Sequence, residues 1–420
     1  MKNQKVALVL VAATIISLTS CKKETATEQS TNTVQKMDST FEKGQYGYDL
    51  QFLKKHLKPV ELQAGDARVL ISPEYQGRVM TSSASGDNGF SFGWINGDLI
   101  ASGKIEKHIN AYGGEERFWF GPEGGQFSVF FPKGKSFDFE NWQTPASIDS
   151  EPFETIASDA TSAWFYKKIK LSNYSGSILS FEVNRKISLL NNAEIASDLK
   201  LENIPADVKM VGFKTENHIK NIGSNAWTKE TGALSIWLLG MMNSSPEATV
   251  IIPYKKGDLG TIVKDDYFGK VPAERLIVTD NVIFFKADSK LRSKIGVSPK
   301  RALPVIGSYD AIRKILTIIE CSIEPAATDY VNSAWELQKN PFGGDIINSY
   351  NDGLNAEGKQ LGAFYELETS SKAGFLKSGE TLSHSQSTFH FEGDEAALSI
   401  ISVAKLGVTI DQIKAIFRAK

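Results

Sequence analysis

The sequence lacks an excess of charge of either sign and lacks the common nucleotide-binding motifs. Its 420 residues hold 47 Lys and Arg against 49 Asp and Glu, a formal net charge of −2. No basic stripe breaks this balance, so nucleic acid is not an expected partner. Gly-Xaa-Ser-Xaa-Gly, Walker and dinucleotide motifs are absent, as is a convincing Cys/His nucleophile pair. Metal ligands do not cluster at set spacings either, and we expect neither a metal nor a cofactor.

Cysteine is also scarce, with only Cys21 and Cys321 in the chain. Cys321 lies in the apolar run 315–323 and is most simply a small core residue. Cys21 follows a basic start and an apolar run over residues 6–16 that is too short to span a bilayer as a helix. This pattern predicts a secretory signal peptide over residues 1–20.

The residues before Cys21, Leu-Thr-Ser, resemble the lipobox of bacterial lipoproteins. The resemblance implies cleavage before Cys21 and lipidation of its thiol, which leaves no disulfide for Cys321; an ordinary signal peptide with a free cysteine is the alternative. Residues 21–44 are poor in apolar residues and predict a disordered tether. We therefore expect a protein that is lipid-anchored at the bacterial cell envelope, at the outer membrane or periplasmic face, and that does not cross the membrane.

Residues 45–420 show no second linker and many short strand-like segments between turns, which predicts one all-β domain. Few segments have helical spacing. They are 48–57 at the start, 395–407 between a capping Asp394 and Gly407, and 409–420 at the end. The predicted strands are 68–72, 78–83, 127–132, 163–172, 178–190, 233–242, 248–254, 275–287 and 315–323.

Acidic and imidazole side chains concentrate in residues 362–393, read as two strands that flank a loop at 371–380. Alternation puts Glu366 and Glu368 on one face of the first strand, and His384 on one face of the second. The centre of the second strand, 383–388, has no apolar residue, so we expect it to line a cleft or an edge. Acids and imidazoles on adjacent strands would form an acid/base pair. A solvated hairpin with paired polar side chains is the alternative.

The same segment resembles the C-terminal signature of the aldose 1-epimerases (galactose mutarotases). The matching residues are Leu367, Glu368, Thr369, Leu376, Gly379, Glu380 and Phe391, with Ser370 in place of a Gln and Ser378 in place of a Pro. The resemblance implies a large antiparallel β-supersandwich with short N- and C-terminal helices, and it implies that Glu368 is the catalytic base. Segments 71–83, 113–125 and 348–353 resemble the superfamily more loosely, and together they are most similar to a group of uncharacterised bacterial lipoproteins placed in it.

The catalytic acid of that family is a His in an Asn-His-x-x-x-Asn-Leu segment, which resembles residues 216–223 here. His218 is the candidate, but only two residues separate it from Asn221, so that alignment puts Asn217 at the acid's position. A slip of one residue reverses the face of a strand. Either a β-bulge returns His218 to the pocket, or His218 points away from it.

Six further residues are candidate ligand contacts. An Arg can bind sugar hydroxyls or an acidic sugar through its fork of donors, and a Trp can stack on the apolar face of a sugar ring. The alternative is an ion pair for the Arg, a core position for the Trp, and a polar turn for the Asn and Asp candidates. The candidates are Arg117, Trp119, Glu366, His384, Asn351 and Asp352.

Two functions from different classes fit these residues. The first is a membrane-anchored carbohydrate-binding protein whose mutarotase-like cleft interconverts sugar anomers, with Glu368 as base. The second is a non-catalytic glycan-binding or structural envelope lipoprotein, which the shifted His218 and the Ser at 370 favour. In both readings we expect a monomer that contacts a carbohydrate and meets the membrane only through its lipid.

Overall fold

The computed structural model describes residues 40–355 and 358–418. The predicted signal peptide, the lipidation site at Cys21 and nearly all of the predicted tether lie outside the described residues. No helix within the described ranges is long and apolar enough to cross a membrane.

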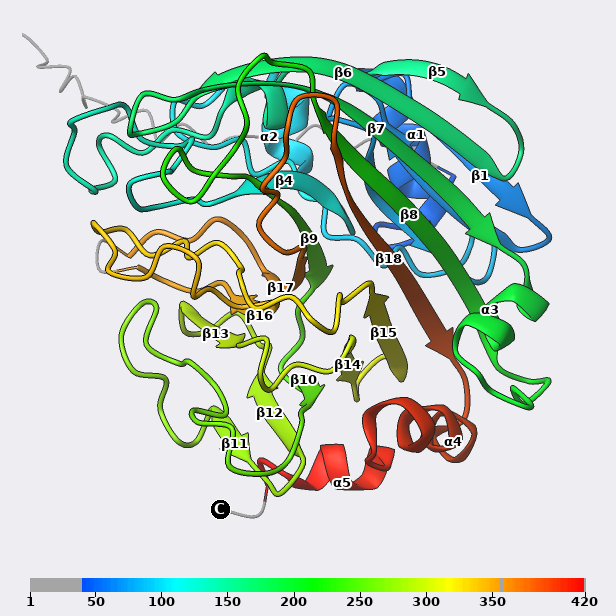
Figure 1. Ribbon diagram of the computed structural model, residues 1–420. Coiled ribbons are helices and arrows are strands. Elements are labelled where there is room, and N and C mark those ends of the chain that lie inside the picture. The colour runs from blue at the N-terminus through cyan, green and yellow to red at the C-terminus, as the bar shows by residue number, and fades with distance from the viewer. Residues whose placement is uncertain (1–39, 356–357, 419–420) are drawn as a thin grey trace, which may run out of the picture. The chain divides into compact units, whose positions relative to one another are not determined.

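The described residues form three sheets in which all strand pairs are antiparallel (Figure 1). The first sheet is β1 (Val60–Ala64), β2 (Ala67–Ser72) and β3 (Arg78–Ser83), in that order. The second sheet has ten strands, in the order β11 (Leu276–Val278), β12 (Val282–Lys286), β10 (Ala248–Pro253), β14 (Val305–Asp310), β15 (Ile315–Cys321), β18 (Thr381–Glu392), β8 (Lys209–Asn221), β7 (Ile178–Leu190), β6 (Ser162–Ser172) and β5 (Glu154–Ser158). The third sheet has the order β13 (Ser293–Val297), β16 (Ile347–Asn351), β17 (Phe364–Ser370), β9 (Ser235–Asn243) and β4 (Arg117–Gly121). The predicted all-β fold with large antiparallel sheets is confirmed.

The helices are short and lie mainly at the ends of the domain, as predicted. They are α1 (Tyr46–His56), α2 (Gly97–Ser102), the 3-10 turn η1 (Ala146–Ile148), α3 (Asn192–Asp198), α4 (Glu395–Leu406) and α5 (Ile410–Ala415). Asp394 caps α4 by accepting a hydrogen bond from the backbone N–H of Ala396, and Gly407 ends the helix with a φ of 75°. α5 is shorter than the predicted 409–420. α3 was not predicted, although Asn191 and Glu194 form a capping box at its start.

The hairpin expected over residues 362–393 does not form. β17 pairs with β16 and β9 in the third sheet, whereas β18 pairs with β15 and β8 near the middle of the second sheet. Of the two expected places for the polar second strand, a cleft or an edge, the edge is therefore wrong. The buried polar residues of β18 meet polar partners on β17 and in the segment before β4, a non-local match that local sequence does not reveal.

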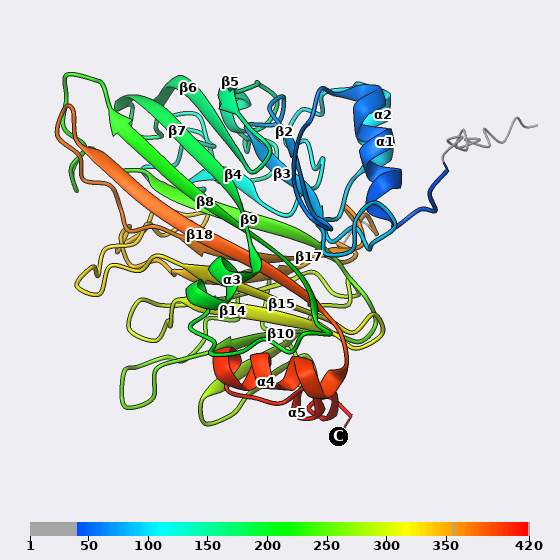
Figure 2. The same cartoon turned by 90° about the vertical axis from the view of Figure 1, so that its right-hand side faces the viewer.

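The second and third sheets pack face to face through an apolar core. Tyr365, Leu367 and Ile347 of the third sheet contact a cluster that includes Ile306 and Ile319 of the second. The opposite face of the second sheet carries another cluster, into which α4 and α5 insert Leu398, Ile401, Leu406, Ile410 and Ile413 (Figure 2). The third sheet thus has one face toward this core, and its other face is covered by other clusters, which include Trp237, Leu239 and Met241.

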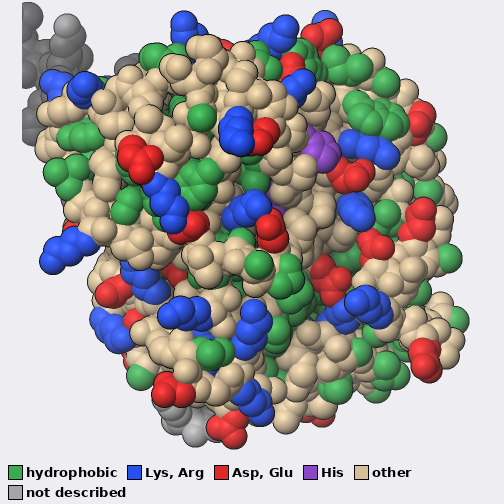
Figure 3. All heavy atoms as spheres, viewed as in Figure 1, with side chains coloured by type: hydrophobic (Ala, Val, Ile, Leu, Met, Phe, Trp, Pro, Cys, Tyr) green, Lys and Arg blue, Asp and Glu red, His purple; other side chains and the backbone are tan. Residues whose placement is uncertain are grey.

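Charged side chains of both signs are interspersed over the face shown in Figure 3. Acidic and basic residues alternate along the outer face of β8, where Glu216 lies between Lys214 and Lys220. This pattern agrees with the expectation that no basic stripe is present on this surface.

Candidate functional site

Glu368 lies at the middle of the third sheet, opposite Asn348 of β16 and Leu239 of β9. Its side chain is fully buried on the sheet face that turns away from the apolar core. Oε2 accepts a hydrogen bond from the indole N–H of Trp237 at 3.0 Å and pairs with Nζ of Lys294 at 2.8 Å. Oε1 has no hydrogen-bond partner among the residues that the structure describes. One oxygen of this carboxylate is therefore held, and the other is available to a ligand.

Lys294 of β13 supplies the positive charge that compensates Glu368. Burial alone would lower the pKa of the Lys294 ammonium, but the neighbouring carboxylates of Glu368 and Glu123 outweigh burial and raise it. The ammonium also lies over the ring of Trp237, 4.9 Å from its centroid. The pair Lys294–Glu368 is thus a buried ion pair whose ammonium carries charge at neutral pH.

Three other predicted residues gather on the same face. Arg117 of β4 pairs with Glu366, which is two residues from Glu368 on β17. The guanidinium of Arg117 lies 4.7 Å from the ring centroid of Trp119, and Trp119 meets Trp237 edge to face at 5.7 Å. Burial raises the pKa of Glu366, against the opposing charge of Arg117. The structure thus brings Glu366, Glu368, Arg117 and Trp119 together on this face.

Glu123, in the turn after β4, is a third carboxylate of this site. Burial of its carboxyl group raises the pKa of Glu123 to about 7, although the charge of Lys294 opposes the shift. The negative charge of Glu368 also raises this pKa, and a hydrogen bond with Trp335 lowers it. A substantial fraction of Glu123 is protonated at neutral pH. Two carboxylates that differ in protonation can act as acid and base on one substrate.

Sequence reasoning missed Lys294, Trp237 and Glu123. Glu123 lies in the stretch 113–125, which resembles the mutarotase superfamily, so its position in the sequence could have suggested it. Lys294 and Trp237 lie in ordinary alternating strands, and they reach Glu368 only because β13 and β9 enter the same sheet. No local pattern marks them.

His384 lies on the other side of β17 from Glu368. Its Nε2 contacts Thr369 Oγ1 at 2.9 Å, and its Nδ1 contacts Ser322 Oγ at 3.1 Å. Burial lowers the pKa of His384 to about 4, so the ring is neutral at pH 7. The structure therefore places this residue in the contact between the two sheets and does not bring it to Glu368.

His218 faces outward from β8, where its Nδ1 contacts Ser383 Oγ at 2.7 Å. The pairing of β8 with β7 and β18 continues without a register shift through this position, so no bulge turns His218 inward. Asn217 is the inward residue, and it is bound by Arg185. The structure does not bring His218 to Glu368, because a one-residue offset reverses the face of the strand.

Asn351 and Asp352 brace loops beside the site. Asn351 donates from Nδ2 to the carbonyl of Leu291 at 2.9 Å. Asp352 accepts hydrogen bonds from the hydroxyl of Tyr350 at 2.6 Å and from the backbone N–H of Gly362 at 2.9 Å. Asp352 also acts electrostatically on Glu366, which places it next to the carboxylate pair.

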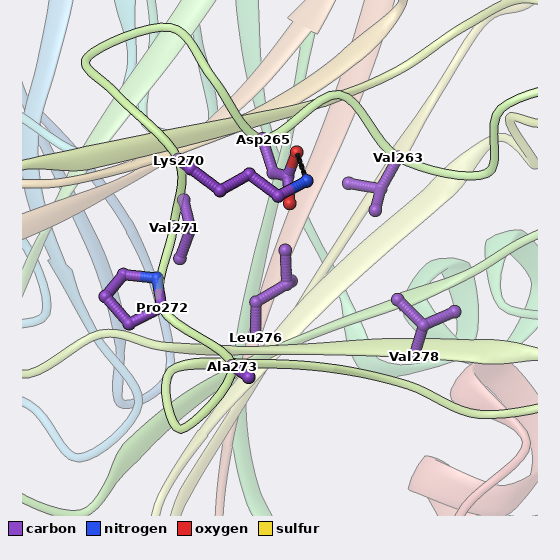
Figure 4. A pocket seen from close by; sticks show the side chains of 8 residues that line it. All are labelled: Val263, Asp265, Lys270, Val271, Pro272, Ala273, Leu276 and Val278. Carbon is purple, nitrogen blue, oxygen red and sulfur yellow. Dashed lines mark hydrogen bonds and ion pairs between the residues drawn. The ribbon is translucent and has the colours of Figure 1, made fainter.

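Two cavities of the described chain lie away from Glu368. A cavity of about 400 Å³ is lined by Val263, Val271, Leu276 and the ion pair of Asp265 with Lys270 (Figure 4). A second, of about 500 Å³, lies between residues 324–329 and 372–382. Glu368 itself is covered, so a ligand reaches its carboxylate only when the covering segments move.

The chain was compared with known families and structures. The model described as "Family of unknown function (DUF6786)" matches residues 44–417. The chain belongs to this family. The comparison with curated proteins found no match.

Solved structures that are similar to the chain include a galactose mutarotase-like protein from Lactobacillus casei ATCC 334, with 8% identity, a TM-score of 0.48, and coverage of 79% of this chain and 100% of that chain. Others are the Slr1438 protein from Synechocystis sp. PCC 6803 (12%, 0.47, 80% and 96%) and a galactose mutarotase related enzyme from Lactobacillus acidophilus (10%, 0.45, 79% and 97%). Two of these solved structures are described as galactose mutarotase-like or galactose mutarotase related, which is the family that the sequence resembles. At these identities the likeness concerns the fold, so the residues of the site carry the functional argument.

The substitution Lys294→Met should destabilise the domain by about 3–5 kcal/mol, because it leaves the buried Glu368 carboxylate without its counter-charge. Urea unfolding monitored by tryptophan fluorescence measures this change. The double variant Lys294→Met/Glu368→Gln should recover much of the loss. Lys186→Met is the control, since its ion pair with Glu216 is solvated and worth less than about 1 kcal/mol. Equal stability of Lys294→Met and the parent would show that the pair does not form.

His384 should make the fold sensitive to acid. The unfolded chain binds the imidazole proton near the ordinary pKa of 6.5, whereas the folded protein binds it only near 4. The unfolded state holds more protons between these values, so the free energy of unfolding falls by up to about 3 kcal/mol as pH decreases from about 6.5 to 4. His384→Gln should lose this part of the pH dependence, and Ser322→Ala, which keeps the ring, should retain it. A His384→Gln profile parallel to that of the parent would contradict the assignment.

Proposed function

We propose that the protein binds a saccharide on the outer face of the third sheet and interconverts its anomers, with Glu368 as the base. One observation carries the proposal: a fully buried carboxylate, compensated by Lys294, presents a free oxygen beside the rings of Trp119 and Trp237. Tryptophan faces pack well against the C–H faces of sugars, and a buried carboxylate oxygen seeks a hydroxyl donor.

The reaction needs one group that accepts a proton and one that donates it. Glu368 accepts the proton of the anomeric hydroxyl while Glu123 donates a proton to the ring oxygen, so the ring opens to the free aldehyde. Rotation about the C1–C2 bond and closure on the other face, with both protons returned, give the other anomer. Arg117 compensates the charge of Glu366, whereas no cation among the described residues lies within ion-pair distance of Glu123. Glu123 is therefore the better acid.

The predicted lipid anchor at Cys21 belongs to this proposal. It would hold the saccharide site at the cell envelope as a monomer tethered by residues 21–44. Edman sequencing and mass spectrometry of the mature protein would detect cleavage before Cys21 and the added acyl chains.

Binding without catalysis is the second candidate function. It is favoured by the direct contact between Lys294 and Glu368, because a carboxylate paired with an ammonium is a weaker proton acceptor than an unpaired one. The position of His218 on the outward face of β8 favours it as well, since the usual acid of the resembling family has no counterpart there.

Anomer exchange measured by NMR separates these functions. The parent should accelerate exchange of at least one aldose, and Glu368→Gln should lower the rate by roughly 10²–10⁴-fold, because an amide cannot accept the proton. Glu154→Gln on the exposed strand β5 is the control and should keep the full rate. Saccharide binding without any acceleration by the parent would leave only the binding function.

The pH profile tests the acid. If Glu123 donates the proton, the rate should fall as pH rises above about 7, where this carboxyl group loses its proton. Glu123→Gln should be slow at every pH and should lack that descending limb. A Glu123→Gln variant that keeps both the rate and the limb would assign the acid to another group.

A further inference from the structure

Arg78, the first residue of β3, is a fully buried arginine that lies beside the proposed saccharide site. Its Nη1 donates to the carbonyl of Gly113 at 3.0 Å, and its Nη2 donates to Oε1 of Gln76 at 3.1 Å. These acceptors are neutral, and no carboxylate within the described ranges lies within ion-pair distance of Arg78. Two other buried arginines differ, since Arg117 pairs with Glu366 and Arg185 pairs with Glu116.

The charge of Arg78 is therefore compensated only by neutral acceptors and by the rings of Tyr75 and Tyr112, whose centroids lie 5.6 and 6.0 Å from the guanidinium. Asp149 acts on it only from beyond ion-pair distance, and this carboxylate is already engaged by the backbone and side-chain amides of Asn110. The positive charge of Arg117 acts in the opposite direction. Burial lowers the pKa of Arg78 to about 9, which leaves the guanidinium charged at neutral pH. A buried charge without a partner is costly and is stabilised by an anion that binds beside it.

The unpartnered polar groups around Arg78 are mostly hydrogen-bond donors. Among the described residues of this region, four N–H groups are buried without an acceptor, and they are Arg78 Nε, Arg117 Nε, Trp119 Nε1 and Trp142 Nε1. The carboxylate oxygen Oε1 of Glu368 is the corresponding acceptor without a donor. Hydroxyls of Thr144 and Ser147 are also free, but each can donate or accept. A ligand that satisfies this surface must offer more acceptors than donors.

These groups form one continuous surface. The guanidinium of Arg117 lies over Trp119, and Phe130 contacts both Trp119, at 5.5 Å, and Trp142, at 6.1 Å. Trp119 leads to Trp237 and so to Glu368. Arg117 is thus joined to the base through the tryptophans, and its charge acts electrostatically on Arg78.

The backbone next to Arg78 is also shaped for its side chain. Gly114 has a φ of 113°, and a Cβ added there would lie 2.7 Å from Cδ of Arg78. Only glycine allows this conformation and this approach without strain. The local backbone therefore fixes where the guanidinium lies.

We propose that Arg78 is the anion subsite of the saccharide site, and that the ligand is an acidic sugar bearing a carboxylate, sulfate or phosphate. The inference rests on the proposed saccharide binding and specifies its substrate class. The anion would accept hydrogen bonds from Arg78 and Arg117, while a hydroxyl of the same sugar would donate to Glu368.

Calorimetric titration of the full chain tests the proposal with matched sugars. Galactose and glucose are the neutral probes, and galacturonate, glucuronate, galactose 6-sulfate and glucose 6-phosphate are the anionic probes. At least one anionic sugar should bind roughly 10- to 100-fold more tightly than its neutral counterpart, because charge-assisted hydrogen bonds are worth that much when buried. The anion that shows the preference identifies which acidic group the subsite takes.

Arg78→Gln should remove the preference while neutral sugars still bind. The matched control is Arg301→Gln, because Arg301 is also buried, also lacks a partner for Nε, and is bound only by the carbonyls of Lys255, Gly257 and Gly260. This control should keep the preference. Circular dichroism shows whether each variant folds. If Arg78→Gln does not fold, the parent's titrations still decide, since they need no variant.

Two negative results are distinguishable. Neutral and acidic sugars that bind the parent equally would overturn the anion subsite and leave the proposed saccharide binding intact. No binding of any of the six probes would overturn both.

Discussion

The buried ion pair between Glu116 and Arg185 is the constraint on which the arrangement of the site depends. Glu116 precedes β4, and its carboxylate is bound by Arg185 of β7 at 2.8 Å and by Gln386 of β18 at 2.8 Å. Removal of either partner would leave a charge in the interior, so the position of Glu116 is strongly fixed. Because neighbouring residues of a strand point to opposite faces, this anchor aims Arg117 at the outer face, where it meets Glu366.

The same alternation of side chains places an ion pair on one face of β17 and a hydrogen-bond network on the other. Glu368 points to the outer face and meets Lys294, whereas Thr369 points to the inner face and meets His384 and Gln386. The inner network is satisfied by hydrogen bonds, among them the one from Gln386 to the Glu116 carboxylate, and it joins the two sheets. The outer face keeps unpaired donors and a free carboxylate oxygen. β17 thus carries a structural contact on one face and a candidate binding site on the other, because successive side chains of a strand point to opposite faces.

Local pattern predicted many of the elements but not their assembly, and two of its strands were wrong, since 127–132 forms no strand and 275–287 divides into β11 and β12. The strand predicted over 178–190 is β7 to the residue, and the cap at Asp394 forms as expected. The pairing of β17 with β18 was wrong because strands that follow each other through a loop usually pair, whereas here they join different sheets. Glu368 could be found because a motif marks it. Lys294 could not, because it reaches Glu368 only through the order of strands in the third sheet.

The buried state of Glu368 constrains how any ligand is bound. A buried ion pair such as Lys294–Glu368 adds little net stability, since desolvation offsets most of the attraction. Its partners can therefore be exchanged at modest cost, provided that the incoming group supplies equal compensation. A sugar hydroxyl is neutral, so it compensates the Glu368 carboxylate less well than the Lys294 ammonium does. A ligand that binds Oε1, however, leaves the contact between Lys294 and Oε2 intact. The free oxygen, rather than the paired one, is for this reason the position from which Glu368 can act.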